Sequence, residues 1–247
     1  MKGFIAILRF TTRLPIPQRE DTTERDLLGG IKYMPLAGGI IGAVAALIYR
    51  ALYGFDPAVA AIAAVLLEII ITGGLHQDGL ADTFDGLYSG KDREGTLEVM
   101  KDSRLGTHGV LALTGALLLK VALVNALKEP GALLAAPVFS RLAMVCGAAF
   151  SRSARQAGLG CLFINGTSGR DALAAGLIAA AISLYPVGAA VTAAAMIVTP
   201  AIALAVVKLC SRRIGGMTGD TLGALGEIAG LGFLVVYCVV IGIAKLV

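Results

Sequence analysis

Charged side chains are scarce in this 247-residue chain, and their scarcity limits the class of protein it can be. Only 15% of the residues are Asp, Glu, Lys or Arg, whereas 57% are hydrophobic and the mean hydropathy is +0.82. A soluble domain typically carries about 25% charged residues. The composition therefore excludes an ordinary soluble domain and predicts an all-α fold, a polytopic bundle of helices in a membrane. The abundance of small residues suits helices that pack closely in lipid.

Paired cysteines are also missing. The four cysteines, Cys146, Cys161, Cys210 and Cys238, are scattered without a CxxC pair, which disfavours a zinc site or a disulfide framework and predicts free thiols. A cleavable signal peptide is not expected either, because Arg9 and Arg13 interrupt the first apolar run. The net charge of +4 is small, and a bias among the loops explains it better than nucleic-acid binding does.

Hydrophobic segments fill most of the chain, which we interpret as one membrane-embedded domain over residues 1–247. Seven segments are predicted to span the bilayer, at 33–52, 57–75, 108–127, 131–150, 171–185, 186–207 and 222–244. Most approach the roughly 20 residues that a spanning helix needs. Only Tyr185-Pro186 separates the fifth from the sixth, so these two could instead form one kinked or re-entrant unit. Residues 1–32 are predicted to be a cytoplasmic N-terminal segment that begins as an amphipathic helix.

The basic residues predict how the chain is oriented. With the N-terminus in the cytoplasm, sixteen Lys and Arg residues fall on the cytoplasmic side, in segments 1–32, 76–107, 151–170 and 208–221. The opposite side holds only Arg50, Lys128 and Lys245. This asymmetry follows the positive-inside rule and predicts a multi-pass protein of the cytoplasmic membrane. It also places the three polar loops on one face.

An acidic stretch at 76–107 holds the first candidate site. Asp78, Asp82 and Asp85 are spaced i, i+4 and i+7, so on a helix they lie within about 60° of one another. Carboxylates held this close repel one another unless a cation binds between them. Hard oxygen ligands favour Mg²⁺, so we predict these three residues as metal ligands. Gly73-Gly74, just before them, is expected to break the preceding helix.

The same stretch ends in a second polar motif, MKDSRLGTHG. Asp102 and Arg104 stand just before the third predicted span, and an Arg side chain can grip a phosphate through two parallel hydrogen bonds. Both residues are candidate catalytic residues. The mixed charges of the 91–101 run, in contrast, are typical of a solvated helix face.

Three further residues carry charge into or beside predicted spans. Arg141 lies deep in the fourth hydrophobic segment, where an unpaired Arg costs at least about 2.5–3.5 kcal/mol. Its expected partner is the carboxylate site or a substrate phosphate. Asp220 and Glu227 are spaced i, i+7 among several glycines near the last span. We predict Asp220 as a metal ligand, and Arg141 and Glu227 as catalytic residues. Together these groups suit metal-assisted phosphoryl or phosphodiester transfer.

Four stretches of the sequence carry a resemblance to a known family. At FIAILRFTTRLPIP, HQDGLADTFDG, MKDSRLGTHGVLAL and GGMTGDTLGALGEI, the chain resembles the cobalamin synthase family, the adenosylcobinamide-GDP ribazoletransferases. The resemblance runs nearly end to end. It implies an integral-membrane, Mg²⁺-dependent enzyme that joins adenosylcobinamide-GDP to α-ribazole, or to its 5′-phosphate, and releases GMP. The family's motifs fall on Asp78, Asp82 and Asp85, then on Asp102, Ser103 and Arg104, and last on Asp220 and Glu227. Asp82 is the best single candidate for the catalytic residue.

Other classes of membrane protein use related acidic patterns. CDP-alcohol phosphotransferases carry a DxxDGxxAR-type motif, but no Arg follows Ala81 here. Intramembrane prenyltransferases pair two Asp-rich motifs, and the segment from Asp220 to Glu227 is a poor second one. An ion-coupled transporter would account for Arg141 and Glu227 inside the membrane. Against it, the acids cluster on one face and no inverted repeat is apparent. The number of metal ions and a homo-oligomeric state stay open.

Overall fold

The computed structural model of the chain describes residues 2–17 and 23–244, and its regular elements are helices. In chain order these are α1 (Lys2–Thr11), α2 (Glu24–Gly30), η1 (Ile31–Tyr33), α3 (Met34–Tyr53), α4 (Pro57–Thr72), α5 (Leu75–Leu87), α6 (Arg93–Val99), α7 (Thr107–Leu127), α8 (Pro130–Ala149), α9 (Leu159–Gly166), α10 (Gly169–Ile214) and α11 (Gly219–Ala244). The described residues form no strand, and their one β-bridge is an isolated pair, Ser153 with Met217. The predicted all-α fold is confirmed.

Several of these helices are membrane spans by length and composition. Within the described ranges, five helices qualify: Glu24–Tyr53, Thr107–Leu127, Pro130–Ala149, Gly169–Ile214 and Gly219–Gly242. The number rises to six if α4 and α5, which meet at an 89° bend, form one broken span. The protein is therefore a multi-pass membrane protein, while the count of seven spans stays a prediction.

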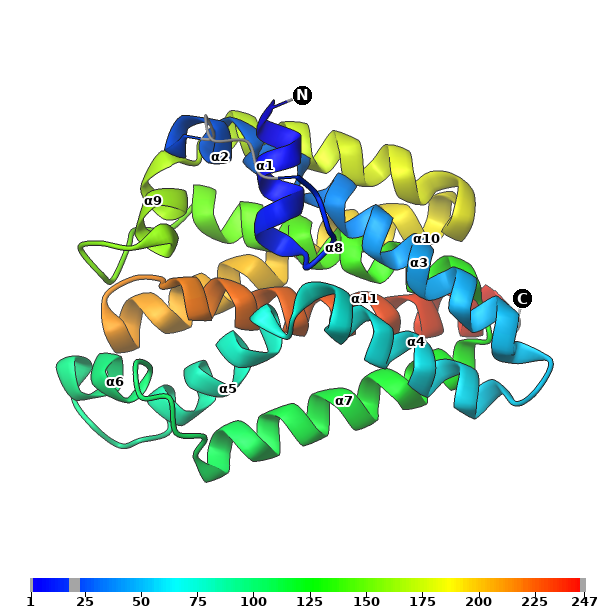
Figure 1. Cartoon of the computed structure of the whole chain (residues 1–247), viewed down its shortest axis with the longest axis horizontal. Helices are drawn as coiled ribbons and strands as arrows, with labels where there is room; N and C mark the ends of the chain where they lie inside the picture. The colour runs from blue at the N-terminus through cyan, green and yellow to red at the C-terminus, as the bar shows by residue number, and fades with distance from the viewer. Residues whose placement is uncertain (1, 18–22, 245–247) are drawn as a thin grey trace.

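The longest helix, α10, folds back on itself. Its 46 residues would extend about 69 Å if they were straight, more than twice the bilayer core of about 30 Å. The backbone leaves the helical conformation at Gly188 (φ 81°, ψ 165°), two residues after Pro186. A Cβ on Gly176 would meet the Met196 side chain at 3.4 Å, so the two arms lie against each other. Figure 1 shows the yellow arm turning back into the orange one. The break expected at Tyr185-Pro186 is thus present, shifted by two or three residues.

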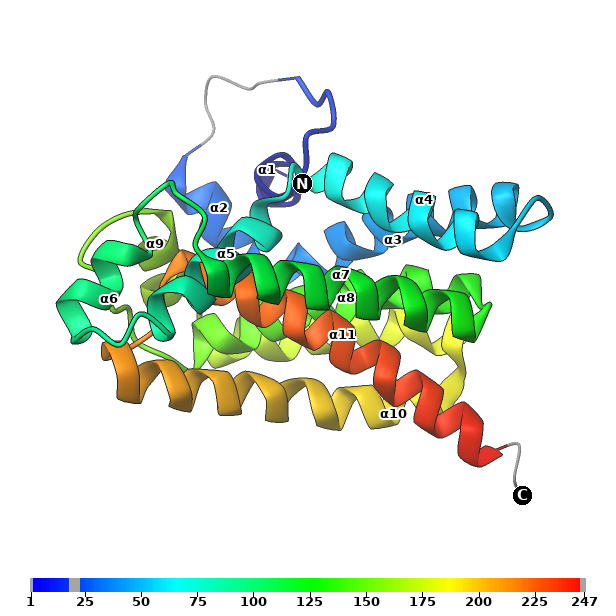
Figure 2. The same ribbon diagram turned by 90° about the horizontal axis from the view of Figure 1, so that it is seen from below.

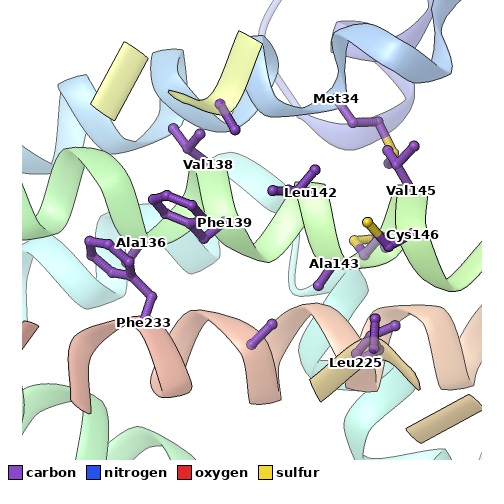
Figure 3. Close-up of a cluster of buried hydrophobic side chains, with 14 of the residues drawn as sticks. Met34, Ala136, Val138, Phe139, Leu142, Ala143, Val145, Cys146, Leu225 and Phe233 are labelled. Atoms are coloured by element: carbon purple, nitrogen blue, oxygen red, sulfur yellow. The ribbon is translucent and has the colours of Figure 1, made fainter. Parts of the chain in front are cut away.

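Helix α8 is the centre of the bundle. Nearly all of its side chains are buried, and α3, α10 and α11 pack around it. Its apolar residues alternate between the α3 and α11 sides of the core (Figure 3). Phe139 of α8 stacks on Phe233 of α11 with 4.8 Å between the ring centroids and 11° between the planes. The side chain of Arg141 is buried on this same helix.

Small residues let α3 approach α8 closely. A Cβ on Gly38 would collide with the carbonyl oxygen of Pro137, and one on Gly42 with that of Leu134. This small-xxx-small spacing brings two backbones into contact, which maximises van der Waals packing where the surrounding lipid provides no hydrophobic driving force between helices. The glycine content of the chain therefore serves helix packing here.

The polar loops gather at one end of the bundle. In both views α5, α6, α9 and the turn between α10 and α11 lie at the same end, whereas the α3–α4 and α7–α8 turns lie at the other (Figures 1 and 2). The three loops that the sequence analysis placed on one face, 76–107, 151–170 and 208–221, are therefore neighbours. Residues far apart in the chain meet at this end.

Candidate active site

The corner between α4 and α5 positions the acidic helix. Gly73 and Gly74 both adopt left-handed conformations, with φ values of 65° and 71°. This region suits glycine because a side chain there is strained. Gly73 ends α4, and α5 begins at Leu75 after the 89° bend. The predicted helix break is confirmed, and the three aspartates of the motif lie on the new helix.

A polar cavity of about 700 Å³ opens beside α5. Its lining includes Asp78 and Asp82 from α5, and Asp102 and Arg104 from the loop before α7. Two sequence motifs that lie some twenty residues apart thus share one cavity, as the sequence analysis expected. Its further polar lining includes Arg13, Gln77 and Lys101.

Asp102 and Arg104 pair with each other at the rim of this cavity. The Arg104 side chain donates to both carboxylate oxygens of Asp102, and the Arg104 backbone N–H donates to Oδ1 at 3.0 Å. These hydrogen bonds hold the pKa of the Asp102 carboxyl at about 2. Since that pKa lies below its usual value, the pairing is present at neutral pH and is lost only as the pH falls toward 2. The Arg104 side chain is nevertheless 88% exposed, so its remaining N–H groups are accessible to a phosphate.

Asp220 lies against the acidic helix. Gly79 of α5 allows this approach, because a Cβ there would lie only 2.7 Å from the backbone oxygen of Asp220. Asp78 and Asp220 line a second, smaller cavity together. The charges of Asp78, Asp220 and Asp85 all act on Asp82. Carboxylates crowded in this way repel one another unless a cation binds among them or one of them is protonated.

Arg155 pairs with Asp220, with its guanidinium 3.1 Å from Oδ2. Backbone hydrogen bonds at the Ser153–Met217 bridge join the 151–158 loop to the start of α11. They hold Arg155 beside Asp220. At the start of α11 the backbone N–H of Thr218 donates to the Thr221 hydroxyl, and the backbone N–H of Thr221 donates to the Thr218 hydroxyl. The Thr221 hydroxyl also donates to the Thr218 carbonyl oxygen. Asp220 therefore does not serve as the cap of this helix, and its carboxylate faces Arg155.

Asp85 has a structural role in addition to the predicted one. Its two oxygens accept hydrogen bonds from the backbone N–H groups of Gly106 and Gly109, each at 2.8 Å. These are unpaired donors at the start of α7, so Asp85 caps that helix from a distant part of the chain. Either glycine's Cβ would collide with this carboxylate. Asp85 thereby fixes the loop that carries Asp102 and Arg104 to the acidic helix.

Replacing Asp85 with alanine is expected to lower the free energy of unfolding by about 1–2 kcal/mol, because two N–H groups lose their acceptor. Thermal unfolding in detergent measures the loss. Asp56, which caps α4 through Ala58 and Val59, provides the matched control. Asp56→Ala should cost similar stability, whereas only Asp85→Ala should also lower enzyme activity, since it releases the loop of the site. Equal stability of Asp85→Ala and wild type would contradict the capping role.

Arg141 and Glu227 lie outside the polar cavity. Arg141 is 1% exposed, and its Nη1 atom lies 3.9 Å from Oε1 of Glu68 on α4. The same Glu68 oxygen accepts a hydrogen bond of 3.0 Å from Lys120 on α7. Glu227 lines a narrow cleft with Glu68 and Lys120 that has no room for a water molecule. The partner of Arg141 is thus Glu68 rather than the acidic motif, and the four charges form a buried ionic cluster.

Sequence reasoning missed Glu68 and Lys120, although the signal was present. Each is a charged residue inside a predicted span, which is the feature that singled out Arg141. Gln77 connects this cluster to the cavity: it lines the cavity, and its Nε2 donates to Oε1 of Glu227 at 3.1 Å. Glu227 therefore reaches the site through Gln77.

The residues at the cavity can be tested for their fit to Mg²⁺. Among the described residues, no three His, Cys, Asp or Glu side chains are already arranged as a metal site. Mg²⁺ usually binds through one or two carboxylates together with substrate phosphates and water, and seldom in an all-protein cage. Asp78 and Asp82, with Asp220 alongside, supply hard oxygen ligands of this kind. The donor set fits Mg²⁺ that arrives with a phosphorylated substrate.

Fold and site together define a class, the multi-pass helical membrane proteins with a carboxylate-lined cavity at one end of the bundle. The model of one protein family, described as cobalamin-5-phosphate synthase, matches residues 3–238. The chain belongs to this family, and it is a transferase of cobalamin biosynthesis.

Curated relatives are similar in sequence to this chain over nearly its whole length. A protein of Thermoanaerobacter pseudethanolicus named adenosylcobinamide-GDP ribazoletransferase is 39% identical, with 96% of this chain and 97% of the relative covered. A protein of the same name from Citrobacter koseri is 40% identical, with 94% and 98% covered. Another from Alkaliphilus metalliredigens is 40% identical, with 92% and 91% covered. No solved structure matches this fold.

Proposed function

We propose that the protein joins adenosylcobinamide-GDP to α-ribazole, or to α-ribazole 5′-phosphate, in a Mg²⁺-dependent reaction. The products are adenosylcobalamin, or its 5′-phosphate, and GMP. The names of its relatives support this reaction. The observation that carries it is the meeting of Asp78 and Asp82 with Asp102 and Arg104 on one cavity large enough for a nucleoside diphosphate group.

The reaction exchanges one phosphorus–oxygen bond for another. A ribazole hydroxyl oxygen bonds to the cobinamide-linked phosphorus, and the bond from that phosphorus to the GMP oxygen breaks. Asp82 accepts the proton of the hydroxyl, because it is half-buried among other carboxylates on the cavity wall. Arg104 and Arg155 provide positive charge for the phosphate oxygens. Asp78, Asp82 and Asp220, with Asp85 beside them, would hold Mg²⁺, and the bound ion would neutralise charge on the diphosphate.

Glu227 and Arg141 act on this site from a distance. Glu227 holds Gln77, which lies one residue before Asp78 on α5. Lys120 and Arg141 pair with Glu68, which lines the same narrow cleft as Glu227, so two cations accompany the two buried acids. In our proposal both residues position α5.

The active end faces the cytoplasm in our proposal, and the protein lies in the cytoplasmic membrane with seven spans and a cytoplasmic N-terminus. The excess of Lys and Arg in the loops at that end supports this orientation. Counting the two arms of α10 as separate spans, and α4 with α5 as one, yields seven.

The deciding experiment uses the purified chain in detergent or liposomes with adenosylcobinamide-GDP, α-ribazole and Mg²⁺. Formation of adenosylcobalamin and GMP in equal amounts is expected. If folded protein forms neither product, the proposed reaction is excluded. Ion flux across sealed liposomes without these substrates would favour the transporter alternative instead.

Removal of divalent metal should abolish turnover. With EDTA in excess, GMP release is expected to fall to the level without enzyme, because the carboxylates and the diphosphate then repel one another. Added Mg²⁺ should restore the rate, and Ca²⁺ should restore it poorly since Ca²⁺ prefers more ligands and longer bonds. Undiminished GMP release in EDTA would contradict a role for metal.

A further inference from the structure

A second cavity of about 230 Å³ adjoins the acidic one. It lies among α1, α3, α5, α8, α9 and α11, and most of its lining is apolar, including Phe10, Met34, Met144, Phe163 and Leu222. The two aromatic rings come from different helices, with their centroids 5.2 Å apart and their planes at 50°. Such a cavity suits a small aromatic or aliphatic group and is too small for a corrin ring.

The two cavities meet at Asp78. Asp78 and Leu75 line both of them, while Asp220 lines the smaller one. A molecule whose apolar part fills the small cavity would therefore place its polar part beside the carboxylates. The approach of Gly79 to Asp220 brings α5 and α11 together at this point.

A histidine that has an unpartnered buried nitrogen borders the small cavity. His76 is 2% exposed and lines it, and the His76 Nε2 has no hydrogen-bond partner among the described residues. A buried imidazole nitrogen usually has a partner, since leaving it unpaired costs about 1–3 kcal/mol. The nitrogen itself is not exposed to the cavity, so a ligand with a ring nitrogen or a hydroxyl group would become its partner after the His76 ring turns toward it.

We propose that the small cavity binds the aromatic base of α-ribazole, and that the acidic cavity binds the diphosphate of the second substrate. This inference rests on the proposed function and assigns the place of one substrate within it. The base is a fused bicyclic ring with hydrocarbon edges and one free ring nitrogen, which matches an apolar lining with one unpartnered histidine. Guanine matches poorly, because its several donors and acceptors would stay unpaired there.

The assignment explains how the two substrates meet. With its base in the small cavity, α-ribazole has its ribose at the border formed by Asp78. The attacking hydroxyl then stands at the entrance of the acidic cavity, next to Asp82 and the phosphates. Reacting groups held in this way gain rate from proximity.

Two variants of α8 test this location. Ala148 lines the small cavity and is 1% exposed, so Ala148→Val reduces the space for the base. The KM for α-ribazole is expected to rise about tenfold or more, with the KM for adenosylcobinamide-GDP unchanged. Ala135→Val makes the same change at a buried position of α8 outside the cavity, and it controls for packing strain. Equal effects of Ala148→Val on both KM values, or no effect, would overturn the assignment.

Met144→Ala enlarges the cavity and keeps the test decisive if Ala148→Val does not fold. We compare the kcat/KM for a ribazole analogue that has a wider, tricyclic base with the kcat/KM for α-ribazole. The ratio of the first to the second should rise about tenfold in this variant. Met196→Ala on α10, away from the cavity, should leave this ratio unchanged. An unchanged ratio in Met144→Ala would overturn the assignment.

Failure of the proposed function and failure of this location give different results. If wild-type protein releases no GMP, the function fails. Equilibrium dialysis of α-ribazole against wild type, Met144→Ala and Ala148→Val then still tests the cavity. Weaker binding to Ala148→Val than to Ala135→Val supports the location, and equal binding excludes it.

Discussion

Replacing Asp82 with asparagine is expected to lower the rate of GMP release about a thousandfold while the protein stays folded. Asp82 lines the polar cavity together with Asp78 and the Asp102–Arg104 pair. An asparagine has nearly the same shape but cannot accept the proton of the attacking hydroxyl, and general-base catalysis contributes about 10²–10⁴-fold. Loss of one negative charge among crowded carboxylates also relieves repulsion, so stability should not fall.

The measurement is single-turnover release of GMP, accompanied by thermal unfolding in the same detergent. Glu98→Gln on α6 provides a control, because it makes the same chemical change on an exposed helix outside the cavity. Asp78→Asn is expected to act differently, by raising the Mg²⁺ concentration needed for half-maximal rate. Full activity of Asp82→Asn would remove Asp82 from the reaction.

Replacing Lys120 with methionine is expected to destabilise the protein by about 3–5 kcal/mol. The Lys120 side chain is 9% exposed and donates to Glu68, which is 4% exposed. Removing one partner of a buried ion pair leaves the other charge uncompensated, which accounts for a cost of this size. Thermal or denaturant unfolding in detergent measures it. Lys208→Met on α10 removes an exposed charge and should change stability little.

The double variant Glu68→Gln, Lys120→Met separates pairing from burial. Because it removes both charges, its stability should exceed that of Lys120→Met alone. The coupling free energy between the two substitutions should be about 0.5–3 kcal/mol, as is typical of residues in contact. A double variant less stable than Lys120→Met would contradict the pairing. Activity should follow stability in this series, because the cluster is connected to the site through the hydrogen bond from Gln77 to Glu227.

Local features of the chain could be predicted where neighbouring residues decide them. The helical class, the break at Gly73-Gly74 and the position of the aspartates on one helix depend on composition, on glycine conformation and on the helical period. These are short-range properties, and the structure confirms them. The fold-back of α10 near Pro186 follows from the same kind of local signal.

The sequence by itself thus determined that the protein is a bundle of membrane helices with an acidic helix at one end, and its motifs resembled the family to which it belongs. Only the tertiary structure decided which charges meet. It placed Asp85 on the start of α7, Arg155 on Asp220, and Arg141 beside Glu68 in the core. The reason is physical: such pairings depend on the rotation and axial position of helices that are distant in the chain, which no local period encodes. Close contacts between glycines and backbone, such as that of Gly79 with Asp220, set these positions.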